Sequence, residues 1–224
     1  MGISRLSSSG ARSCTLPRVR TTDPLWYLFT KRLLDILGAT AAIVIAAPIM
    51  VVAVIAVRLE TPGPVFFRQY RLGRNGRPFL LYKIRSMTAS APDIRDSLED
   101  DNEASGPVFK IKADPRITRV GRVLRKYSID EMPQLFHVLF GQMSLVGPRP
   151  PIPAEVERYE PWQTERLAVK PGLTCIWQVS GRSDIGFDEW IRMDIEYVRN
   201  RNLWLDIKLL LLTIPAVLTA RGAY

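Results

Sequence analysis

Cysteine and histidine are scarce in this chain of 224 residues, which contains only Cys14, Cys175 and His137 of these two types. Two cysteines so far apart provide neither a disulfide framework nor the ligand spacing of a zinc site. A single histidine excludes a histidine-rich metal cluster and makes any catalytic triad depend on one residue. Internal repeats are also lacking. The chemistry must therefore rest on carboxylates, lysines, arginines and any Mg²⁺ that they bind.

Basic residues outnumber acidic ones, with 31 Lys and Arg against 22 Asp and Glu and a formal net charge of +9. Such an excess indicates an anionic partner, which is a nucleic acid, an anionic bilayer surface or a phosphorylated substrate. A basic but merely soluble surface is the plainer interpretation. Nucleic-acid binding is disfavoured, because no aromatic platforms lie among the basic residues and it leaves the long apolar run unexplained.

That apolar run covers residues 36–57 and contains no charged residue. As a helix it would extend roughly 33 Å, enough to cross the hydrocarbon core of a bilayer. Basic residues flank both of its ends, and the positive-inside rule places both flanks in the cytoplasm. Pro48 near the middle removes a backbone hydrogen bond and kinks a helix. We expect a re-entrant helix broken at Pro48; a plain spanning helix is the alternative, and a buried core helix is less favoured.

The expected fold is α+β and mainly α-helical. It combines a re-entrant membrane helix with a cytoplasmic catalytic domain, which contains a small β-hairpin and interfacial amphipathic helices. The expected units are a disordered basic tail at 1–30, the re-entrant membrane helix hairpin at 31–58 and the cytoplasmic domain at 59–224.

The pattern of apolar and polar residues predicts where the helices and strands of the cytoplasmic domain lie. Short strands at 65–67 and 79–82 form the hairpin around a turn at 73–76. The acidic stretch 93–105 is interpreted as a solvated, mobile insertion. Residues 203–218 are interpreted as an interfacial helix, with a hydrophobic core helix as the alternative. Helical spacing predicts three further helices, at 117–126, 130–140 and 187–199.

Two adjacent carboxylates, Asp130 and Glu131, stand at the start of the helix expected at 130–140. The spacing of Ser128 and Glu131 fits a capping box, whereas Pro133 favours a helix start nearer Asp130. In either case the helix dipole stabilises negative charge there, and both carboxylates are expected to be ionised at neutral pH. Helix capping alone is the plainer explanation of this spacing.

Basic residues lead toward this carboxylate pair. A stripe next to ionised carboxylates is typical of a site for Mg²⁺ and a diphosphate, in which arginines bind phosphate oxygens and one carboxylate attacks phosphorus. A solvated helix face, or one resting on lipid headgroups, is the competing interpretation. The stripe consists of Arg116, Arg119, Arg122, Arg125 and Lys126.

Two other segments add phosphate-binding potential. Lys83 and Arg85 occupy alternate positions after the second expected strand, which places them on one face. Pro148 and Pro150 stiffen the loop that carries Arg149, so this arginine has little conformational freedom to lose on binding.

Taken together, these segments resemble the bacterial sugar transferase family, the monotopic polyprenyl-phosphate phosphoglycosyl transferases of the exopolysaccharide-initiating type. The resemblance covers about residues 31–224 and involves many motifs in the same order. They are Lys31-Arg-Leu-Leu-Asp35, Gly63-Pro-Val-Phe-Phe-Arg-Gln69, Lys83-Ile-Arg-Ser-Met87, Asp114-Pro-Arg-Ile-Thr-Arg-Val-Gly-Arg122, Ser128-Ile-Asp-Glu-Met-Pro-Gln-Leu135, Met143-Ser-Leu-Val-Gly-Pro-Arg-Pro150, Trp177-Gln-Val-Ser-Gly-Arg182 and Gly222-Ala-Tyr224.

The resemblance implies an activity at the inner membrane of a bacterium, with the catalytic domain on the cytoplasmic face. Asp130 would be the nucleophile that takes the sugar-phosphate from a UDP-sugar, with release of UMP, and undecaprenyl phosphate would then accept it. Glu131 would be its partner in the dyad, and Mg²⁺ would bind beside Asp130. The family's membrane helix breaks at a proline, which matches Pro48. The implied substrate-binding residues are Lys83, Arg85, Arg125, Arg149 and Arg182.

One departure from the family pattern is Cys175, where relatives usually have glycine. A side chain at that position is expected to constrain the backbone and reshape a loop near the site. An alternative function is a catalytically silent membrane scaffold or regulator with the same fold, which the intact Asp130, Glu131, Lys83 and Arg125 disfavour. The sequence leaves open which sugar is transferred, which polysaccharide is begun, and whether the chain forms a homo-oligomer.

Overall fold

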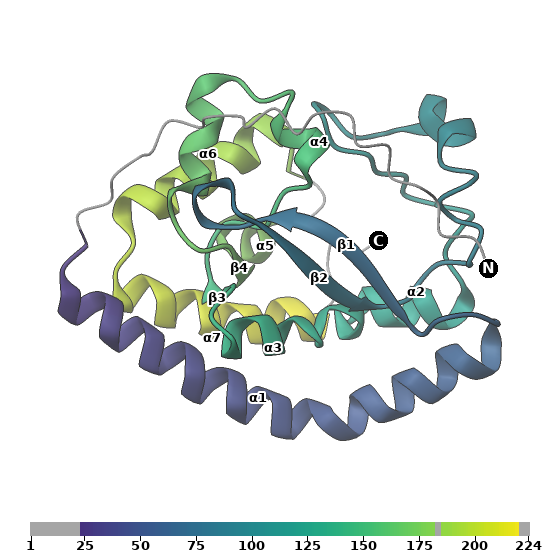
Figure 1. Cartoon of the computed structure of the whole chain (residues 1–224), viewed down its shortest axis with the longest axis horizontal. Helices are drawn as coiled ribbons and strands as arrows, with labels where there is room; N and C mark the ends of the chain where they lie inside the picture. Colours follow the sequence, from purple (N-terminus) through teal and green to yellow (C-terminus); the bar gives the residue numbers. More distant parts are fainter. Residues whose placement is uncertain (1–22, 182–184, 220–224) are drawn as a thin grey trace.

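The computed structural model describes residues 23–181 and 185–219 and combines one long helix with a compact body of shorter elements (Figure 1). The expected tail at 1–30 therefore falls mostly outside the described residues, and the long helix begins at Leu25, before the expected boundary. The helices are α1 Leu25–Glu60, α2 Arg119–Lys126, α3 Gln134–Leu139, α4 Pro153–Val156, α5 Ile176–Ser180, α6 Phe187–Asn200 and α7 Leu203–Thr219. The strands are β1 Phe66–Leu72, β2 Pro78–Ile84, β3 Ser144–Val146 and β4 Gly172–Thr174.

Helix α1 is apolar through most of its 36 residues and has Pro48 inside it. It follows a bowed course, with both ends directed toward the body of the molecule (Figure 1). One stripe of α1 is buried at helical spacing, including Ala39, Ala46 and Ala53. Alanine allows the rest of the chain to approach closely there. The opposite face exposes large apolar side chains, so the body covers α1 on one side only.

By length and composition, α1 could cross a membrane, with a mean hydropathy of 2.7 in its most apolar window and only 17% of that window buried. Such a low buried share distinguishes it from the core helix of a soluble protein. The expected break at Pro48 is not seen, because α1 is one continuous helix through this residue, and it changes direction gradually along its bow. The path through a bilayer stays a prediction.

Polar side chains fasten the first third of α1 to the body. The Lys31 ammonium forms an ion pair with Asp206 on α7 at 2.9 Å. The two guanidinium nitrogens of Arg32 donate hydrogen bonds to the carbonyls of Val138 and Leu139, near the end of α3, at 2.7 Å each. The buried Asp35 carboxylate accepts hydrogen bonds from Ser144 Oγ and the Leu145 amide at 2.9 Å. Three residues of the Lys31–Asp35 motif thus have a structural role.

The main core lies where α1, α3, α6 and α7 meet the two small sheets. Fully buried members include Val138, Met143, Val146 and Tyr197. A second cluster, around Trp177 and Ile191, joins α5 to α6. A third cluster packs Leu124 of α2 against Ala53 and Val57 near the end of α1. Helix α1 is consequently attached to the body near both of its ends.

The expected hairpin is confirmed, with longer strands than the sequence indicated. Strands β1 and β2 pair antiparallel from Phe66 opposite Ile84 to Leu72 opposite Pro78. The parallel pair β3–β4 was not expected. The strands come so close together that a Cβ atom on Gly172 would lie 2.0 Å from the Gly147 amide nitrogen.

The helices expected at 117–126 and 187–199 are confirmed as α2 and α6, and residues 203–218 are helical in α7. The single helix expected at 130–140 is wrong. A 3₁₀ turn covers Ile129–Glu131, and α3 begins only at Gln134. Pro133 is tolerated at the start of α3 but not inside a helix, and it separates the two elements.

The capping box expected at Ser128 is also absent. Ser128 lies in the left-handed region with φ 55°, and its side chain makes no capping hydrogen bond. Such a backbone conformation is uncommon for a residue other than glycine. It turns the chain sharply between α2 and the 3₁₀ turn, which brings the following carboxylates into the interior.

Candidate functional site

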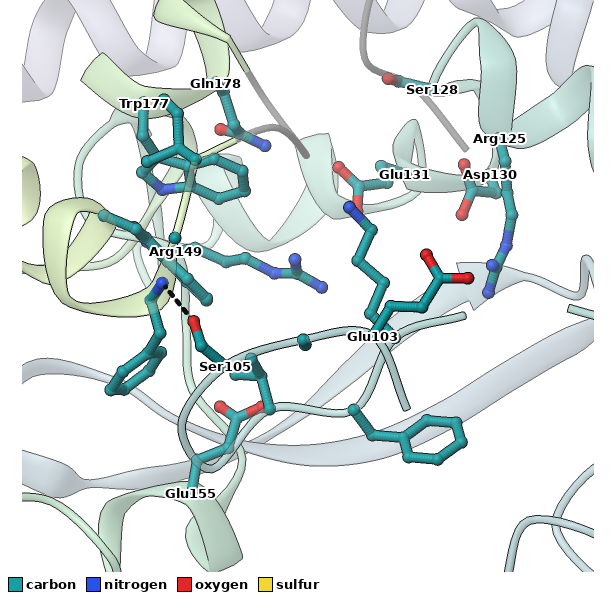
Figure 2. A pocket seen from close by; sticks show the side chains of 18 of the residues that line it. Glu103, Ser105, Arg125, Ser128, Asp130, Glu131, Arg149, Glu155, Trp177 and Gln178 are labelled. Atoms are coloured by element: carbon teal, nitrogen blue, oxygen red, sulfur yellow. Dashed lines mark hydrogen bonds between the residues drawn. The ribbon is translucent and has the colours of Figure 1, made fainter. Parts of the chain in front are cut away.

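An open cleft of about 520 Å³ lies between α2, the 3₁₀ turn, β2 and the loops before α4 and α6 (Figure 2). Its lining is rich in charged side chains, which come from segments far apart in the sequence. Five residues expected in the site line this cleft, so the fold brings them together. They are Lys83, Arg125, Asp130, Glu131 and Arg149.

Glu131 is held in its ionised form by cations. Lys83, at the end of β2, forms an ion pair and a hydrogen bond with it. Burial by itself would raise the pKa of Glu131, but the charge of Lys83, followed by that of Arg149, lowers the pKa to about 2. Its carboxylate therefore carries a negative charge at any physiological pH and fixes the position of the Lys83 ammonium.

Asp130 has a different environment from its neighbour. Its side chain is buried, with 6% of the residue exposed, and it forms no ion pair with any residue that the structure describes. Burial raises its pKa to about 6, against the opposing effect of Lys83; the charge of Glu131 adds to the rise, and Arg125 lowers it. These pKa values agree with two carboxylates that are ionised at neutral pH, but Asp130 takes up a proton at a much higher pH than Glu131. Asp130 is the more basic of the two and has no cation bound directly to it.

Arg125 stands beside Asp130 at the end of α2 (Figure 2). Its Nε donates a hydrogen bond to Ser86 Oγ at 3.0 Å, which orients the guanidinium. Thr118 caps α2 by accepting from the Gly121 amide at 2.9 Å. Gly121 packs directly on the chain after β2, because a Cβ atom there would lie 1.9 Å from the Ser86 carbonyl oxygen. Close packing of α2 therefore sets the position of Arg125.

Arg149 reaches into the cleft from the opposite side (Figure 2). Its carbonyl accepts a hydrogen bond from Arg166 Nη2 at 2.8 Å. Arg166 is fully buried and forms an ion pair with Asp194 on α6 at 2.6 Å. The guanidinium also donates to the Tyr159 hydroxyl at 2.6 Å and lies 5.1 Å from the Trp190 ring centre. This buried network anchors the loop that carries Arg149.

One of the expected substrate-binding residues, Arg85, does not line the cleft. The Arg85 guanidinium donates to the carbonyls of Thr61 and Pro62 at 2.8 and 2.7 Å and ties down the chain after α1. Strand β2 ends at Ile84, so the alternation that would place Arg85 on the same face as Lys83 does not extend to it. Arg182 lies outside the described residues.

The basic stripe contributes one residue, Arg125, to the cleft. Successive steps of three residues rotate by about 60° around a helix, so its members spread over several faces. Arg119, Arg122 and Lys126 are exposed on α2. Arg116 precedes the helix and pairs with the buried Asp114 at 2.7 Å.

Several residues of the cleft were not expected. Glu103 and Ser105 belong to the stretch interpreted as a solvated insertion, but both line the cleft, and the Glu103 carboxylate points into it (Figure 2). Ser105 Oγ accepts from the Phe187 amide at 3.0 Å and joins this segment to α6. Both residues are exposed, as a solvated segment requires, but the interpretation missed that this segment lines the cleft. An acidic composition is typical of a solvated loop, and the segment has no periodic pattern that would predict its place beside the cleft.

His137 and Cys175 have structural roles. The two ring nitrogens of His137 contact Gln142 Oε1 at 2.6 Å and the Tyr82 amide at 3.2 Å, so neither is available to a substrate. Cys175 is fully buried and donates to Gln178 Oε1 at 3.0 Å. Its backbone is extended, with φ −153°, a conformation open to any residue. The expected constraint on the loop is absent.

The donor set of the cleft fits a Mg²⁺ ion that is shared with a substrate. Among the described residues no group of three or more His, Cys, Asp or Glu side chains could hold a metal by itself. Mg²⁺ commonly binds through one or two carboxylates together with substrate phosphates and water. Asp130 offers a carboxylate without an ion-pair partner, and Glu103 points into the same cleft.

Comparison with known proteins gives a consistent result. The family described as Bacterial sugar transferase matches residues 26–220. The chain is 46% identical, over 88% of its length, to the galactosyl transferase CpsE of Streptococcus agalactiae serotype III, and covers 44% of that relative. Several curated relatives are thus more than twice as long as the matched region.

Two relatives are covered more completely. The exopolysaccharide production protein ExoY of Rhizobium meliloti is 37% identical, with 87% of this chain and 88% of the relative aligned. A UDP-glucose:undecaprenyl-phosphate glucose-1-phosphate transferase of Caulobacter vibrioides is 40% identical, with 87% of this chain and 72% of the relative aligned. The alignments cover most of the chain.

Proposed function

Since this chain belongs to the bacterial sugar transferase family, we propose that it transfers a sugar-1-phosphate from a UDP-sugar to polyprenyl phosphate at a membrane. The observation that carries the proposal is the cleft itself, where a buried carboxylate without an ion-pair partner among the described residues lies with Lys83, Arg125 and Arg149. A diphosphate needs such cations, and an attack on phosphorus needs such a carboxylate. The relative from Caulobacter vibrioides is named for the same type of reaction.

The proposed reaction has two displacements at one phosphorus atom. An Asp130 oxygen attacks the phosphorus that carries the sugar, and the bond from that phosphorus to the bridging oxygen breaks. UMP leaves with the bridging oxygen, and the sugar-phosphate is bound to Asp130. An oxygen of polyprenyl phosphate then attacks the same phosphorus, and the bond to Asp130 breaks. The products are polyprenyl-diphosphate-sugar and the free carboxylate.

The cations of the cleft have separate roles in this scheme. Arg125 and Arg149 approach from opposite sides and would bind phosphate oxygens, whose charge increases as the bond to UMP breaks. Lys83 is held by its ion pair with Glu131, next to the two carboxylates. A Mg²⁺ ion held by Asp130 and the diphosphate would shield negative charge and let the anionic nucleophile approach.

The first test is UMP release from UDP-sugars in the presence of polyprenyl phosphate. Asp130→Asn should abolish it, because the amide keeps the shape of the side chain but is a very poor nucleophile. Rapid quenching with donor labelled in the transferred phosphate should trap label on the wild-type polypeptide. Turnover at the wild-type rate in the Asn variant would disprove the nucleophile.

A second test addresses the metal. Excess EDTA should stop UMP release, and added Mg²⁺ should restore it. Undiminished turnover in EDTA would show that the basic side chains of the cleft neutralise the diphosphate without a metal.

The membrane location is part of the proposal. Helix α1 would enter and leave the cytoplasmic face of the inner membrane, with Pro48 in the hydrocarbon core, and α7 would lie in the interface. The exposed apolar face of α1 and the exposed Trp204 on α7 support this arrangement. The acceptor lipid would then reach the cleft from the bilayer, while the UDP-sugar arrives from the cytoplasm.

A further inference from the structure

A second cavity, of about 210 Å³, lies at the other end of α1 from the cleft. Among the described residues, none lines both hollows. Its walls come from the first turns of α1, β3, the segment before β4, and the end of α6. Arg32 lies 25 residues before Val57, which packs against α2, and this separation corresponds to about 37 Å along a straight helix. The cavity is therefore a separate feature from the candidate active site.

Positive charge is concentrated around this cavity. Five cations and two carboxylates line it, and two of the cations are neutralised directly. Lys31 pairs with Asp206 at 2.9 Å, and Arg201 pairs with Asp23 at 2.6 Å. The other three cations form no ion pair within the described chain; they are Arg32, Arg74 and Lys170. They face a single further carboxylate, Asp35, which already accepts two hydrogen bonds.

Arg32 and Lys170 converge on one point. A Cβ atom on Gly141 would lie 3.4 Å from Arg32 Nη2 and 3.5 Å from Lys170 Nζ. Glycine leaves this space open, and its φ of +81° favours glycine there. Arg32 contacts only carbonyl oxygens, which do not neutralise a full charge. Two cations thus share a space in which neither forms an ion pair with a described residue.

The pKa of Lys170 reflects this crowding. Burial lowers it first, and repulsion from Arg32 adds to the effect, while Asp35 acts in the opposite direction. Arg74 and Lys31 lower it further. An anion bound between these groups would relieve the repulsion.

Exposed apolar side chains surround the same end of the molecule. Trp26 and Phe29 on α1 are 65% and 73% exposed, and Phe140, next to Gly141, is 74% exposed. Trp204 at the start of α7 is 75% exposed and lies two residues before the partner of Lys31. Tryptophan and phenylalanine beside basic residues are typical of a surface at the headgroup level of a bilayer.

From these observations we infer that the cavity lined by Arg32 and Lys170 binds the phosphate of an anionic membrane phospholipid, whose acyl chains lie along the exposed apolar face of α1. The lining of the cavity suits this ligand, since it combines basic side chains with the apolar side chains of Leu28, Val146 and Val169. The inference rests on the proposed embedding of α1 in a bilayer, but not on the proposed reaction. It adds a lipid site that is distinct from the acceptor site in the cleft.

The test measures lipid binding by native mass spectrometry of the full chain in detergent, titrated with phosphatidylglycerol. Lys170→Gln removes a cation that forms no ion pair with any described residue, and it should weaken the first binding step about fivefold. Lys170→Glu should weaken it further. The matched control is Arg122→Gln, which removes an exposed cation on α2 and should bind like the wild type.

Further arms distinguish the source of the phosphate. Phosphatidylcholine should bind more weakly than phosphatidylglycerol to the wild type and show no loss in Lys170→Gln. Inorganic phosphate should not displace phosphatidylglycerol; displacement at millimolar concentration would replace the lipid by a free anion. Equal phosphatidylglycerol affinity in the wild type and both Lys170 variants would overturn the site.

Two controls separate this inference from the other proposals. Circular dichroism and UMP release should be unchanged in Lys170→Gln, so that lost lipid binding does not reflect misfolding. Sedimentation of the wild type with phosphatidylcholine vesicles tests the embedding of α1 by itself. If the wild type does not sediment with the vesicles, both the embedding of α1 and the assignment of the ligand as a lipid would be overturned. If it sediments but binds phosphatidylglycerol with the same affinity as the Lys170 variants, only the proposed site would be overturned.

Discussion

Asp130 and Glu131 are adjacent in sequence, yet their pKa values shift in opposite directions. Glu131 is bound to Lys83, whereas Asp130 is buried without a direct cation. Pairs of titratable groups whose environments separate their pKa values commonly divide the chemistry between them. Here Glu131 is suited to hold Lys83 in place, and Asp130 is suited to attack phosphorus.

The raised pKa of Asp130 predicts the pH dependence of the reaction. The nucleophile must be ionised, so the rate of UMP release should fall as the pH drops through about 6, the pKa to which burial raises Asp130. An ordinary aspartate would keep its charge down to about pH 4. A pH profile of single-turnover UMP release measures this limb.

The pH profile of the residual activity of Glu131→Gln tests whether the acidic limb belongs to Asp130. Loss of the neighbouring negative charge lowers the pKa of Asp130, so the acidic limb should move to lower pH. A limb that stays in place would assign the titration to another group.

Arg166 supports a prediction on positioning. Arg166→Met leaves Asp194 buried without its cation and should destabilise the fold by about 3–5 kcal/mol. The double variant Arg166→Met/Asp194→Leu should recover much of that stability but not the rate, because the Arg149 carbonyl has lost its donor. Denaturant unfolding and UMP release measure the two effects. A double variant with the wild-type rate would show that the network serves stability alone.

The sequence placed five of the cleft residues correctly in one candidate site but misjudged others. Arg85 was expected beside Lys83 because alternation in a strand was extended one residue past its end. Glu103 was missed because an acidic stretch resembles a solvated loop. The role of Arg166 could not be predicted from the sequence, because its buried ion pair with a residue 28 positions away depends on tertiary packing.

At the scale of elements, α2 acts as the support for Arg125. Gly121→Ala would place a methyl group against the Ser86 carbonyl, which the backbone cannot avoid without moving α2. Overpacking of this kind costs about 1–3 kcal/mol. The displaced helix should also lose the hydrogen bond from Arg125 to Ser86 and release UMP at least tenfold more slowly, a loss of about 1.4 kcal/mol or more in transition-state stabilisation.

Arg122→Ala on the same helix is the matched comparison for that variant. Its side chain is exposed, so stability and rate should both stay near wild-type values. A Gly121→Ala enzyme as active as Arg122→Ala would show that α2 can shift without disturbing the site.

Elements with strong local patterns could be predicted, and those fixed by distant partners could not. The hairpin and α6 have clear periodicity in the sequence. Strands β3 and β4 have three residues each and pair across 28 positions, which leaves too little pattern to detect. The helix expected at 130–140 was overextended, because apolar spacing continued across Pro133.

At the scale of the whole molecule, the two ends of α1 predict its topology. Leu25 and Leu59 are 83% and 81% exposed, and each can be replaced by cysteine without loss of packing. With Cys14→Ser as background and Cys175 fully buried, a membrane-impermeant maleimide reports on these positions alone. Both should react from the cytoplasmic side of inverted vesicles.

Labelling of Leu25→Cys only from the opposite side would contradict the re-entrant course and favour a plain spanning helix. Labelling from neither side would indicate that the ends of α1 lie below the headgroups. The bow of α1 and its double attachment to the body are the observations on which the expected result depends.

The last residue of α1 has a further consequence. The Glu60 carboxylate accepts hydrogen bonds from the Arg119 and Val120 amides at 2.8 and 3.1 Å, so α1 caps the start of α2, the helix that carries Arg125. The helical stretch from Pro48 to Glu60 then keeps Pro48 a fixed distance of about 18 Å from the start of α2. Adding one helical turn to this stretch, or removing one, would move the cleft by about 5.4 Å relative to the lipid phosphates. Membrane thickness would thereby become a determinant of turnover.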